Sequence, residues 1–205
     1  MLLNRVLRDS DREELGPTIA LMTDLCPETM SRKIPRANVQ QAFVFNVVRG
    51  KSVPGTQVLA VGSYEDTAAE SLGKLGYVVT EVDPMINETL ASFSDHADHL
   101  FSVIIATSVL EHVKDDEGFI RDICWLLEPG GYAVLTCDFK NGYVVGDALP
   151  AENERFYTKY DLETRLGTVI WGCDCNLLDM PSWEGEPDFS YGGCSYSFAT
   201  LVFGW

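Results

Sequence analysis

The chain of 205 residues is long enough for one domain with a complete hydrophobic core. Its 46% apolar and 22% charged residues are typical of a globular protein and exclude a disordered, collagen-like or coiled-coil chain. The formal net charge of −16 argues against nucleic acids and anionic membranes as partners, because both are bound through Lys and Arg.

The sequence predicts a cytoplasmic protein. No apolar segment is long enough to cross a bilayer, and the charged stretch 1–15 lacks the apolar core of a signal peptide. The six scattered cysteines are therefore interpreted as reduced thiols. Cys173, Cys175 and Cys194 lack the paired spacing of a structural zinc site, so no metal is expected.

Residues 1–50 show helical periodicity and no clear strand. Apolar residues between 15 and 25 fall on one helical stripe, with Pro17 near its first turn, and 37–49 predict a second helix. We expect these helices to form an N-terminal extension that covers the substrate, followed by the main domain over 51–205.

From residue 57 onward, short apolar strands alternate with helices. The predicted elements are strand 57–61, helix 66–75, strand 77–82, helix 84–93, strand 101–106, helix 116–127, strand 132–137, helix 159–166 after a capping box at Thr158 and Asp161, and strands 168–172 and 197–203. This alternation predicts an α/β fold with a mostly parallel sheet and helices on both faces. The last strand is expected to be antiparallel, because a short connection from 168–172 permits a hairpin-like return.

Two strand ends carry residues that suit a ligand, because ligands of an open parallel sheet bind outside the carboxyl ends of its strands. Gly62 directly follows strand 57–61, and a residue without Cβ lets the backbone approach a ligand closely. Asp83 ends the next strand, at a spacing from Gly62 that suits an acceptor for ribose hydroxyls. Asp83 also suits the N-cap of a helix that begins at Pro84.

The segment 103–138 carries a more specific pattern. It runs from a strand through a Leu-Glu-His-Val turn (110–113) and a helix to a Pro-Gly-Gly turn (129–131) and another strand. This order resembles the second half of a class I S-adenosylmethionine-dependent methyltransferase, and the strand ends at Gly62 and Asp83 match the family's first two. The resemblance implies a Rossmann-like fold and S-adenosylmethionine as the cofactor.

The resemblance also implies positions for the cofactor. The implied residues are Gly62, Ser63 and Tyr64 at the methionine portion, Asp83 at the ribose, Met85 at the adenine with Pro84 before it, and Thr107 and Ser108 beneath the methyl group. The chain departs from the family pattern at Ala60, where an acidic residue is usual, and at Tyr64, where a second glycine is usual. The segment 84–100 is short for the helix and strand expected there, and it leaves Asp95 or Asp98 as a partner for the adenine.

Three residues are candidates for the chemistry. Asp138 follows strand 132–137, where the family often presents substrate-contacting side chains, and Tyr143 would form a wall of the same pocket. His112 is a candidate general base because imidazole titrates near neutrality, although a structural role in its turn is favoured. The loop 179–193, with Trp183 and Tyr191, is a candidate lid.

The predicted function is methyl transfer to oxygen or nitrogen of a small molecule, either a sugar or a secondary metabolite. The alternative is a non-enzymatic module of the same fold that has lost the cofactor and acts as a partner or regulatory subunit. A nucleotide-dependent oxidoreductase is disfavoured because the chain lacks a Gly-x-Gly-x-x-Gly turn. The sequence leaves open the identity of the acceptor and whether the chain forms a homodimer.

Overall fold

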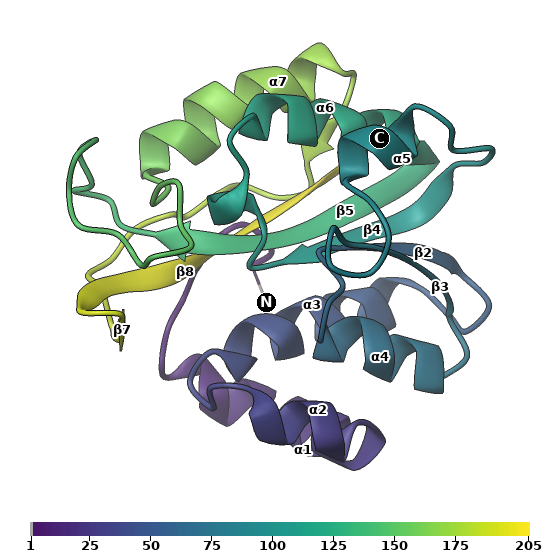
Figure 1. Ribbon diagram of the computed structural model, residues 1–205, viewed down its shortest axis with the longest axis horizontal. Helices are drawn as coiled ribbons and strands as arrows, with labels where there is room; N and C mark the ends of the chain where they lie inside the picture. The colour runs from purple at the N-terminus through teal and green to yellow at the C-terminus, as the bar shows by residue number, and fades with distance from the viewer. Residues whose placement is uncertain (1) are drawn as a thin grey trace.

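The computed structural model describes residues 2–205 and shows a mixed sheet with helices on both faces (Figure 1). The strand order is β1-β8-β5-β4-β2-β3, and β6 and β7 pair with β8 outside this path. The strands are β1 (Val6–Leu7), β2 (Gln57–Val61), β3 (Val78–Val82), β4 (Phe101–Thr107), β5 (Leu127–Phe139), β6 (Asn176–Leu177), β7 (Phe189–Tyr191) and β8 (Cys194–Gly204). Within residues 2–205, no helix combines the length and apolar character of a bilayer span.

The helices lie in two layers, one on each face of the sheet (Figure 1). They are α1 (Asp11–Leu25), α2 (Pro27–Arg32), α3 (Asn38–Lys51), α4 (Thr67–Lys74), α5 (Leu90–Ser94), α6 (Asp116–Leu126) and α7 (Gly167–Gly172). A 3-10 turn, η1 (Leu110–His112), follows β4, and a π-helical segment, η2 (Asp161–Leu166), precedes α7.

The sheet has the predicted mixture of directions. Strands β3, β2, β4 and β5 are parallel to one another. Strand β8 runs antiparallel to β5, from the pair Tyr132–Gly204 to the pair Phe139–Ser197. This arrangement confirms the mostly parallel, Rossmann-like α/β fold with an antiparallel last strand.

The route into β8 differs from the prediction, because residues 168–172 form a helix rather than a strand. The predicted capping box is present: the Thr158 N–H donates to Asp161 Oδ2 at 2.9 Å, and the Asp161 N–H donates to Thr158 Oγ1 at 3.2 Å. The helix then continues through η2 and α7, with Ile170 buried and Trp171 exposed. The chain therefore reaches β8 through a helix and the β7–β8 hairpin.

The predicted helix 84–93 is also wrong. Asp83 and Asn87 close a tight turn instead: Asn87 Oδ1 accepts from the Asp83 N–H at 2.9 Å, and Asp83 Oδ1 accepts from the Met85 N–H at 2.7 Å. Asp and Asn side chains favour such local bonds over a continuing helix. Only the short α5, capped by Thr89, remains of the predicted helix.

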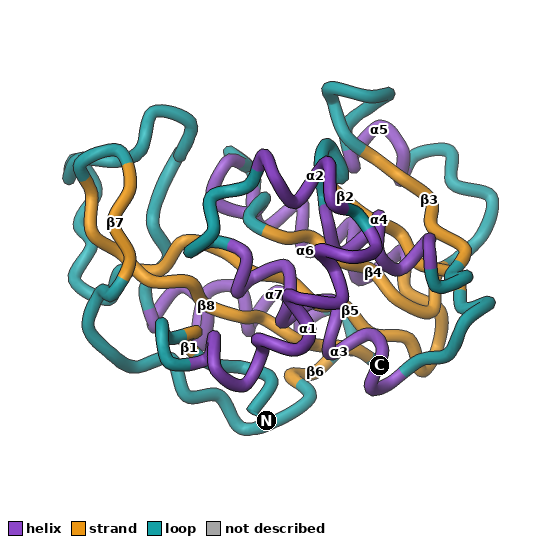
Figure 2. The backbone as a smooth tube through the Cα atoms, turned by 90° about the horizontal axis from the view of Figure 1, so that it is seen from below, coloured by secondary structure: helices purple, strands orange, loops and turns teal. Residues whose placement is uncertain are grey.

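Within residues 2–50, strand β1 and helix α3 pack against the sheet, and helix α1 packs against α3. Helix α3 covers the lower face of the sheet (Figures 1 and 2), and Phe43 and Phe45 are fully buried in the same hydrophobic cluster as Val58 of β2. Strand β1 pairs with β8, although no strand is predicted in this segment. Pro17 lies in the interior of α1 rather than in its first turn. The division into an extension and a main domain stays a prediction.

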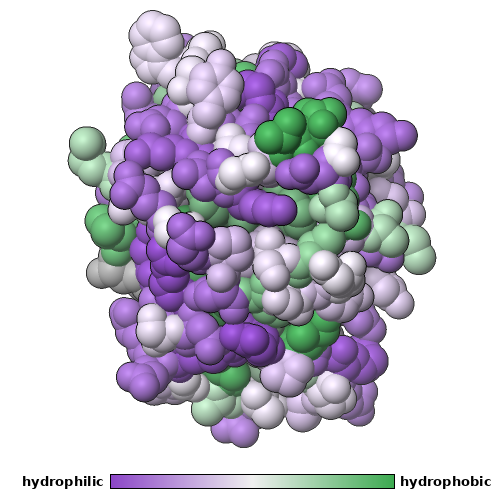
Figure 3. Space-filling model, turned by 90° about the vertical axis from the view of Figure 1, so that its left-hand side faces the viewer, coloured by the Kyte–Doolittle hydropathy of each residue, from purple (hydrophilic) through white to green (hydrophobic). Residues whose placement is uncertain are grey.

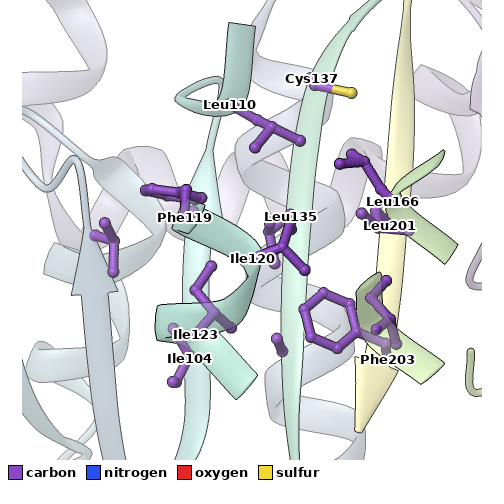
Figure 4. Packing of buried hydrophobic residues seen from close by; sticks show 14 of the residues in the cluster. Ile104, Leu110, Phe119, Ile120, Ile123, Leu135, Cys137, Leu166, Leu201 and Phe203 are labelled. Atoms are coloured by element: carbon purple, nitrogen blue, oxygen red, sulfur yellow. The ribbon is translucent and has the colours of Figure 1, made fainter. Parts of the chain in front are cut away.

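Helix α6 covers the opposite face of the sheet. Its residues Ile120 and Ile123 belong to one buried cluster with Ile104 of β4 and Leu135 of β5 (Figure 4). The neighbouring Ile105 belongs to the cluster on the α3 side. A strand that is buried on both faces cannot slip by one residue without exchanging these two sets of contacts. The packing therefore fixes where each strand ends.

The turn after β2 depends on Gly62, whose φ is +67° and whose added Cβ would overlap the Val109 side chain. We expect Gly62→Ala to lower the free energy of unfolding by about 2 to 4 kcal/mol in urea denaturation. Gly142→Ala is the matched control, because no atom lies within 4 Å of a Cβ built there. Equal stability of the two variants would contradict this account.

Candidate functional site

The carboxyl ends of the parallel strands surround a cavity of about 630 Å³, called here the main cavity. The predicted site residues that line it are Tyr64, Asp83, Met85, Ser108, His112 and Asp138. The N-terminal segment contributes Ile34, Ala37 and Gln40, and the β7–β8 hairpin forms a further wall. The strand ends therefore bring six predicted residues together.

Asp83 is the most constrained of these residues. Its side chain is buried, Oδ2 accepts from the Tyr64 N–H at 3.0 Å, and Oδ1 accepts from the Met85 N–H at 2.7 Å. The carboxylate therefore links the turn after β2 to the turn after β3. Asp83 caps a turn rather than the helix expected at Pro84, and Tyr64 is more than half exposed and leaves the cavity open.

A side cavity of about 320 Å³ adjoins the main cavity and shares Tyr64 and Ser108 with it. Gly62 and Thr107 line it, together with the cations Arg32 and Lys33. Four buried oxygen atoms on its walls have no hydrogen-bond partner within residues 2–205: Asn38 Oδ1, Gln40 Oε1, Asp66 Oδ2 and Thr107 Oγ1. The side cavity thus offers positive charge and free acceptors near one another.

Gly62 also borders an apolar cleft of about 270 Å³ on the α6 side of the sheet. Its walls include Pro84, Val109 and Phe119. The carboxylate of Asp122 lies at this cleft, where partial burial raises its pKa and Ser94 Oγ donates to it at 3.3 Å. Neither Asp95 nor Asp98, the two residues considered from the sequence, lines the cleft.

Two buried carboxyl groups face the main cavity. Glu111 Oε1 accepts from Ser108 Oγ at 2.6 Å, whereas Glu111 Oε2 has no partner among the described residues. Asp138 Oδ2 accepts from Asn153 Nδ2 at 2.9 Å. Burial raises the pKa of Glu111 to about 7, and burial together with the nearby charge of Glu111 raises the pKa of Asp138 to about 8.

The backbone at Ser108 positions the hydroxyl group that donates to Glu111. Its φ of 58° is a left-handed conformation that a serine adopts at a cost of about 1 to 3 kcal/mol. The Ser108 N–H is held by Thr136, at 3.0 Å to the hydroxyl and 3.1 Å to the carbonyl oxygen. Glu111 is not among the residues that the sequence pattern predicts for the site, although its position three residues after Ser108 was available as a signal.

The remaining predicted residues lie in different places. His112 is exposed at the cavity, with Nδ1 at 2.9 Å from the Glu152 carbonyl oxygen. Tyr143 is not a cavity residue: its ring packs edge-on against Phe156, with 5.7 Å between ring centroids. Ser63 is buried beside a separate hollow next to α4. Pro84 lies in the apolar cleft and Met85 in the main cavity.

The loop predicted as a lid divides into a buried part and a wall. Trp183 is buried, and its indole N–H donates to the Thr200 carbonyl oxygen at 2.8 Å. Further along the chain, Tyr191 of β7 lines the main cavity. The end of the molecule that carries β7 is predominantly hydrophilic at its surface (Figure 3).

The raised pKa of Glu111 has a consequence for stability. Because the folded state keeps this group protonated, the unfolded chain loses its proton first and stability falls as pH rises from about 4.5 to about 7. We expect Glu111→Gln to gain on the order of 2 to 3 kcal/mol relative to the wild-type protein between pH 4.5 and pH 8. Urea denaturation at both pH values measures this, with the exposed Glu163→Gln as the control. Parallel pH profiles for Glu111→Gln and wild type would contradict it.

Comparison with known proteins agrees with this geometry. Residues 27–167 match the family model described as a methyltransferase domain. The human mitochondrial ubiquinone biosynthesis O-methyltransferase is 28% identical over 111 residues, which cover 42% of this chain and 30% of that protein. The matched region thus spans about a third of that curated relative.

Solved structures share the fold. TehB from Haemophilus influenzae has a TM-score of 0.55 at 17% identity, covering 78% of this chain and 60% of its own. The 1,6-didemethyltoxoflavin-N1-methyltransferase from Burkholderia thailandensis, solved with S-adenosylhomocysteine, has a TM-score of 0.55 at 14% identity, covering 97% and 92%. With the family match over more than half of its length, the chain belongs to the class I S-adenosylmethionine-dependent methyltransferases.

Proposed function

We propose that the chain transfers the methyl group of S-adenosylmethionine to an oxygen or nitrogen atom of a small molecule, a sugar or a secondary metabolite, bound in the main cavity. The observation that carries this proposal is the buried Asp83 carboxylate, which two backbone N–H groups hold at the edge of that cavity. Asp83 lines the main cavity, Pro84 lines the apolar cleft, and Gly62 joins the cleft to the side cavity.

The side cavity suits the methionine portion of the cofactor. Arg32 and Lys33 offer positive charge to its carboxylate, although both also contact Glu65, at 2.7 and 3.8 Å. Asp66 Oδ1 accepts from the Ala69 N–H at 2.8 Å, so the partnerless Oδ2 is free to accept from the ammonium group. These donors and acceptors support the fit.

The other two spaces suit the nucleoside. A carboxylate has about four acceptor positions, and the two backbone N–H groups leave Asp83 further positions for ribose hydroxyls. The apolar cleft suits the adenine, with Pro84, Val109 and Phe119 as its walls. The adenine is therefore assigned to the apolar cleft rather than to Met85, which is 76% exposed and faces the main cavity.

The chemistry asked of the protein is positioning and proton transfer. S-adenosylmethionine supplies an electrophilic methyl group on its sulfonium. In this proposal Asp138 accepts the proton that the acceptor hydroxyl or amine loses, since a base is most effective when its pKa lies near the working pH. His112 then passes the proton from the cavity to solvent, and Ile34, Ala37 and Gln40 hold the acceptor from the N-terminal side.

Ala60 and Tyr64 depart from the family pattern and favoured the alternative of a module without cofactor. Their positions in the structure suggest why an enzyme can tolerate them. Ala60 is fully buried in the hydrophobic cluster on the α3 side, where a carboxylate would meet apolar neighbours. Tyr64 points its backbone N–H at Asp83 and leaves its ring exposed. Both observations support the enzyme over the alternative.

The ribose role of Asp83 can be tested with S-adenosylhomocysteine in isothermal titration calorimetry. We expect the wild-type protein to bind it and Asp83→Asn to bind about tenfold more weakly or worse, because a charged acceptor is lost. The exposed Asp98→Asn serves as the control with unchanged affinity. Absence of binding by the wild-type protein would overturn the proposed function, and equal binding by Asp83→Asn would overturn the ribose assignment.

The proton-accepting role of Asp138 predicts a second result. With an acceptor recovered from a metabolite extract, we expect Asp138→Asn to transfer labelled methyl groups about 100-fold more slowly, while its affinity for S-adenosylhomocysteine stays unchanged. Glu163→Gln, a charge change at an exposed residue that does not line the cavity, keeps the wild-type rate. An Asp138→Asn variant with more than half the wild-type rate would exclude the role.

A further inference from the structure

The main cavity is acidic. Asp83, Glu111, Asp138 and Glu152 line it, whereas no Lys or Arg does among residues 2–205, and His112 is the single basic side chain there. The cations of the neighbouring side cavity are paired with Glu65. An anionic group in the main cavity would therefore meet like charge and find no counter-ion.

One wall of the same cavity is aromatic. The β7–β8 hairpin contributes Phe189, Tyr191, Tyr196 and Phe198. Phe189 packs edge-on against Tyr196 at 5.1 Å between centroids, and its ring lies 4.7 Å from that of Phe198. These contacts hold the buried rings of Phe189, Tyr196 and Phe198 in place, and the half-exposed Tyr191 is the most accessible ring of the wall, so a ligand can stack there without a large loss of side-chain freedom.

Next to this wall, where Asp138 of β5 pairs across the strands with Phe198 of β8, the cavity carries an unsatisfied buried atom. Glu111 is fully buried, and its Oε2 has no partner among the described residues while Oε1 is held by Ser108. Asp138, also buried, lines the cavity beside it. Buried polar atoms are normally hydrogen-bonded, so a ligand N–H or O–H group is the partner that this pair lacks.

We propose that the acceptor substrate is a planar aromatic compound without an anionic group, which stacks on the β7–β8 wall and donates a hydrogen bond from a ring N–H or O–H to the Glu111–Asp138 pair. This inference rests on the function proposed above and narrows its acceptor to one chemical class. A sugar can donate the same hydrogen bond but cannot stack on the aromatic wall. An aromatic carboxylate can stack, but it adds a negative charge that the cavity does not neutralise.

A matched pair of ligands tests the proposal: 4-hydroxyquinoline and 4-hydroxyquinoline-2-carboxylate, which differ by one carboxylate. Calorimetry on the protein saturated with S-adenosylhomocysteine gives the ratio of their affinities, measured at pH 9, above the pKa values of about 7 for Glu111 and about 8 for Asp138, so that both carboxyl groups carry charge. We expect the neutral ligand to bind about tenfold tighter or more. The double variant Glu111→Gln/Asp138→Asn should reduce this ratio to about twofold or less, and Glu163→Gln should leave it unchanged.

The outcomes separate the two proposals. Failure of S-adenosylhomocysteine to bind overturns the proposed function, and the affinity ratio is then measured on the protein alone. Equal or tighter binding of the carboxylate, no binding of either ring, or an unchanged ratio in the double variant overturns the acceptor class. Thermal melting checks that the double variant folds, and Tyr191→Ala gives a second test: the affinity for the neutral ring should fall about tenfold.

Discussion

The site depends on the link between the turn after β2 and the turn after β3. The Gly62 N–H donates to the Val82 carbonyl oxygen at 2.8 Å, and the Asp83 carboxylate receives N–H groups from both turns. Because backbone groups hold this carboxylate, its position does not depend on a ligand. The main cavity and the apolar cleft border both turns, and the side cavity borders the turn after β2, so one set of hydrogen bonds links the three spaces.

The buried carboxyl groups of Glu111 and Asp138 lower the stability of the folded protein. A hydrophobic or amide side chain in place of Glu111 would avoid the burial of an acid without a full set of partners. The left-handed Ser108 adds backbone strain at the same place. Strain and unsatisfied groups cluster at functional sites because binding, rather than folding, makes use of them.

The sequence predicts the sheet better than the connections. Strand 57–61 has the predicted bounds because its apolar run 58–61 is buried on both faces of the sheet. Residues 168–172 look like a strand because Thr168, Val169 and Ile170 are β-branched, yet the helix begun at the capping box extends through them. Local preference gives way there to the continuing helix.

The site residues likewise differ in how far the sequence predicts them. Asp83 directly follows β3 and Asp138 is the next-to-last residue of β5, so their meeting at one edge can be derived from the predicted strands alone. Glu111 and the aromatic residues of β7 and β8 reach the cavity through a turn and a hairpin whose placement depends on distant contacts. No local periodicity marks those contacts.

The pairing of β1 with β8 joins segments from opposite parts of the chain. Asn4 donates to the Val202 carbonyl oxygen at 3.0 Å, and the Arg5 N–H donates to Thr200 Oγ1 at 2.9 Å. During synthesis β1 is made long before β8, and β5, once made, also lacks its antiparallel neighbour until β8 follows. Contacts so distant in sequence slow folding and leave strand edges open meanwhile. Strand β8 therefore covers the edges of β1 and β5 in one step, once it takes its place between them.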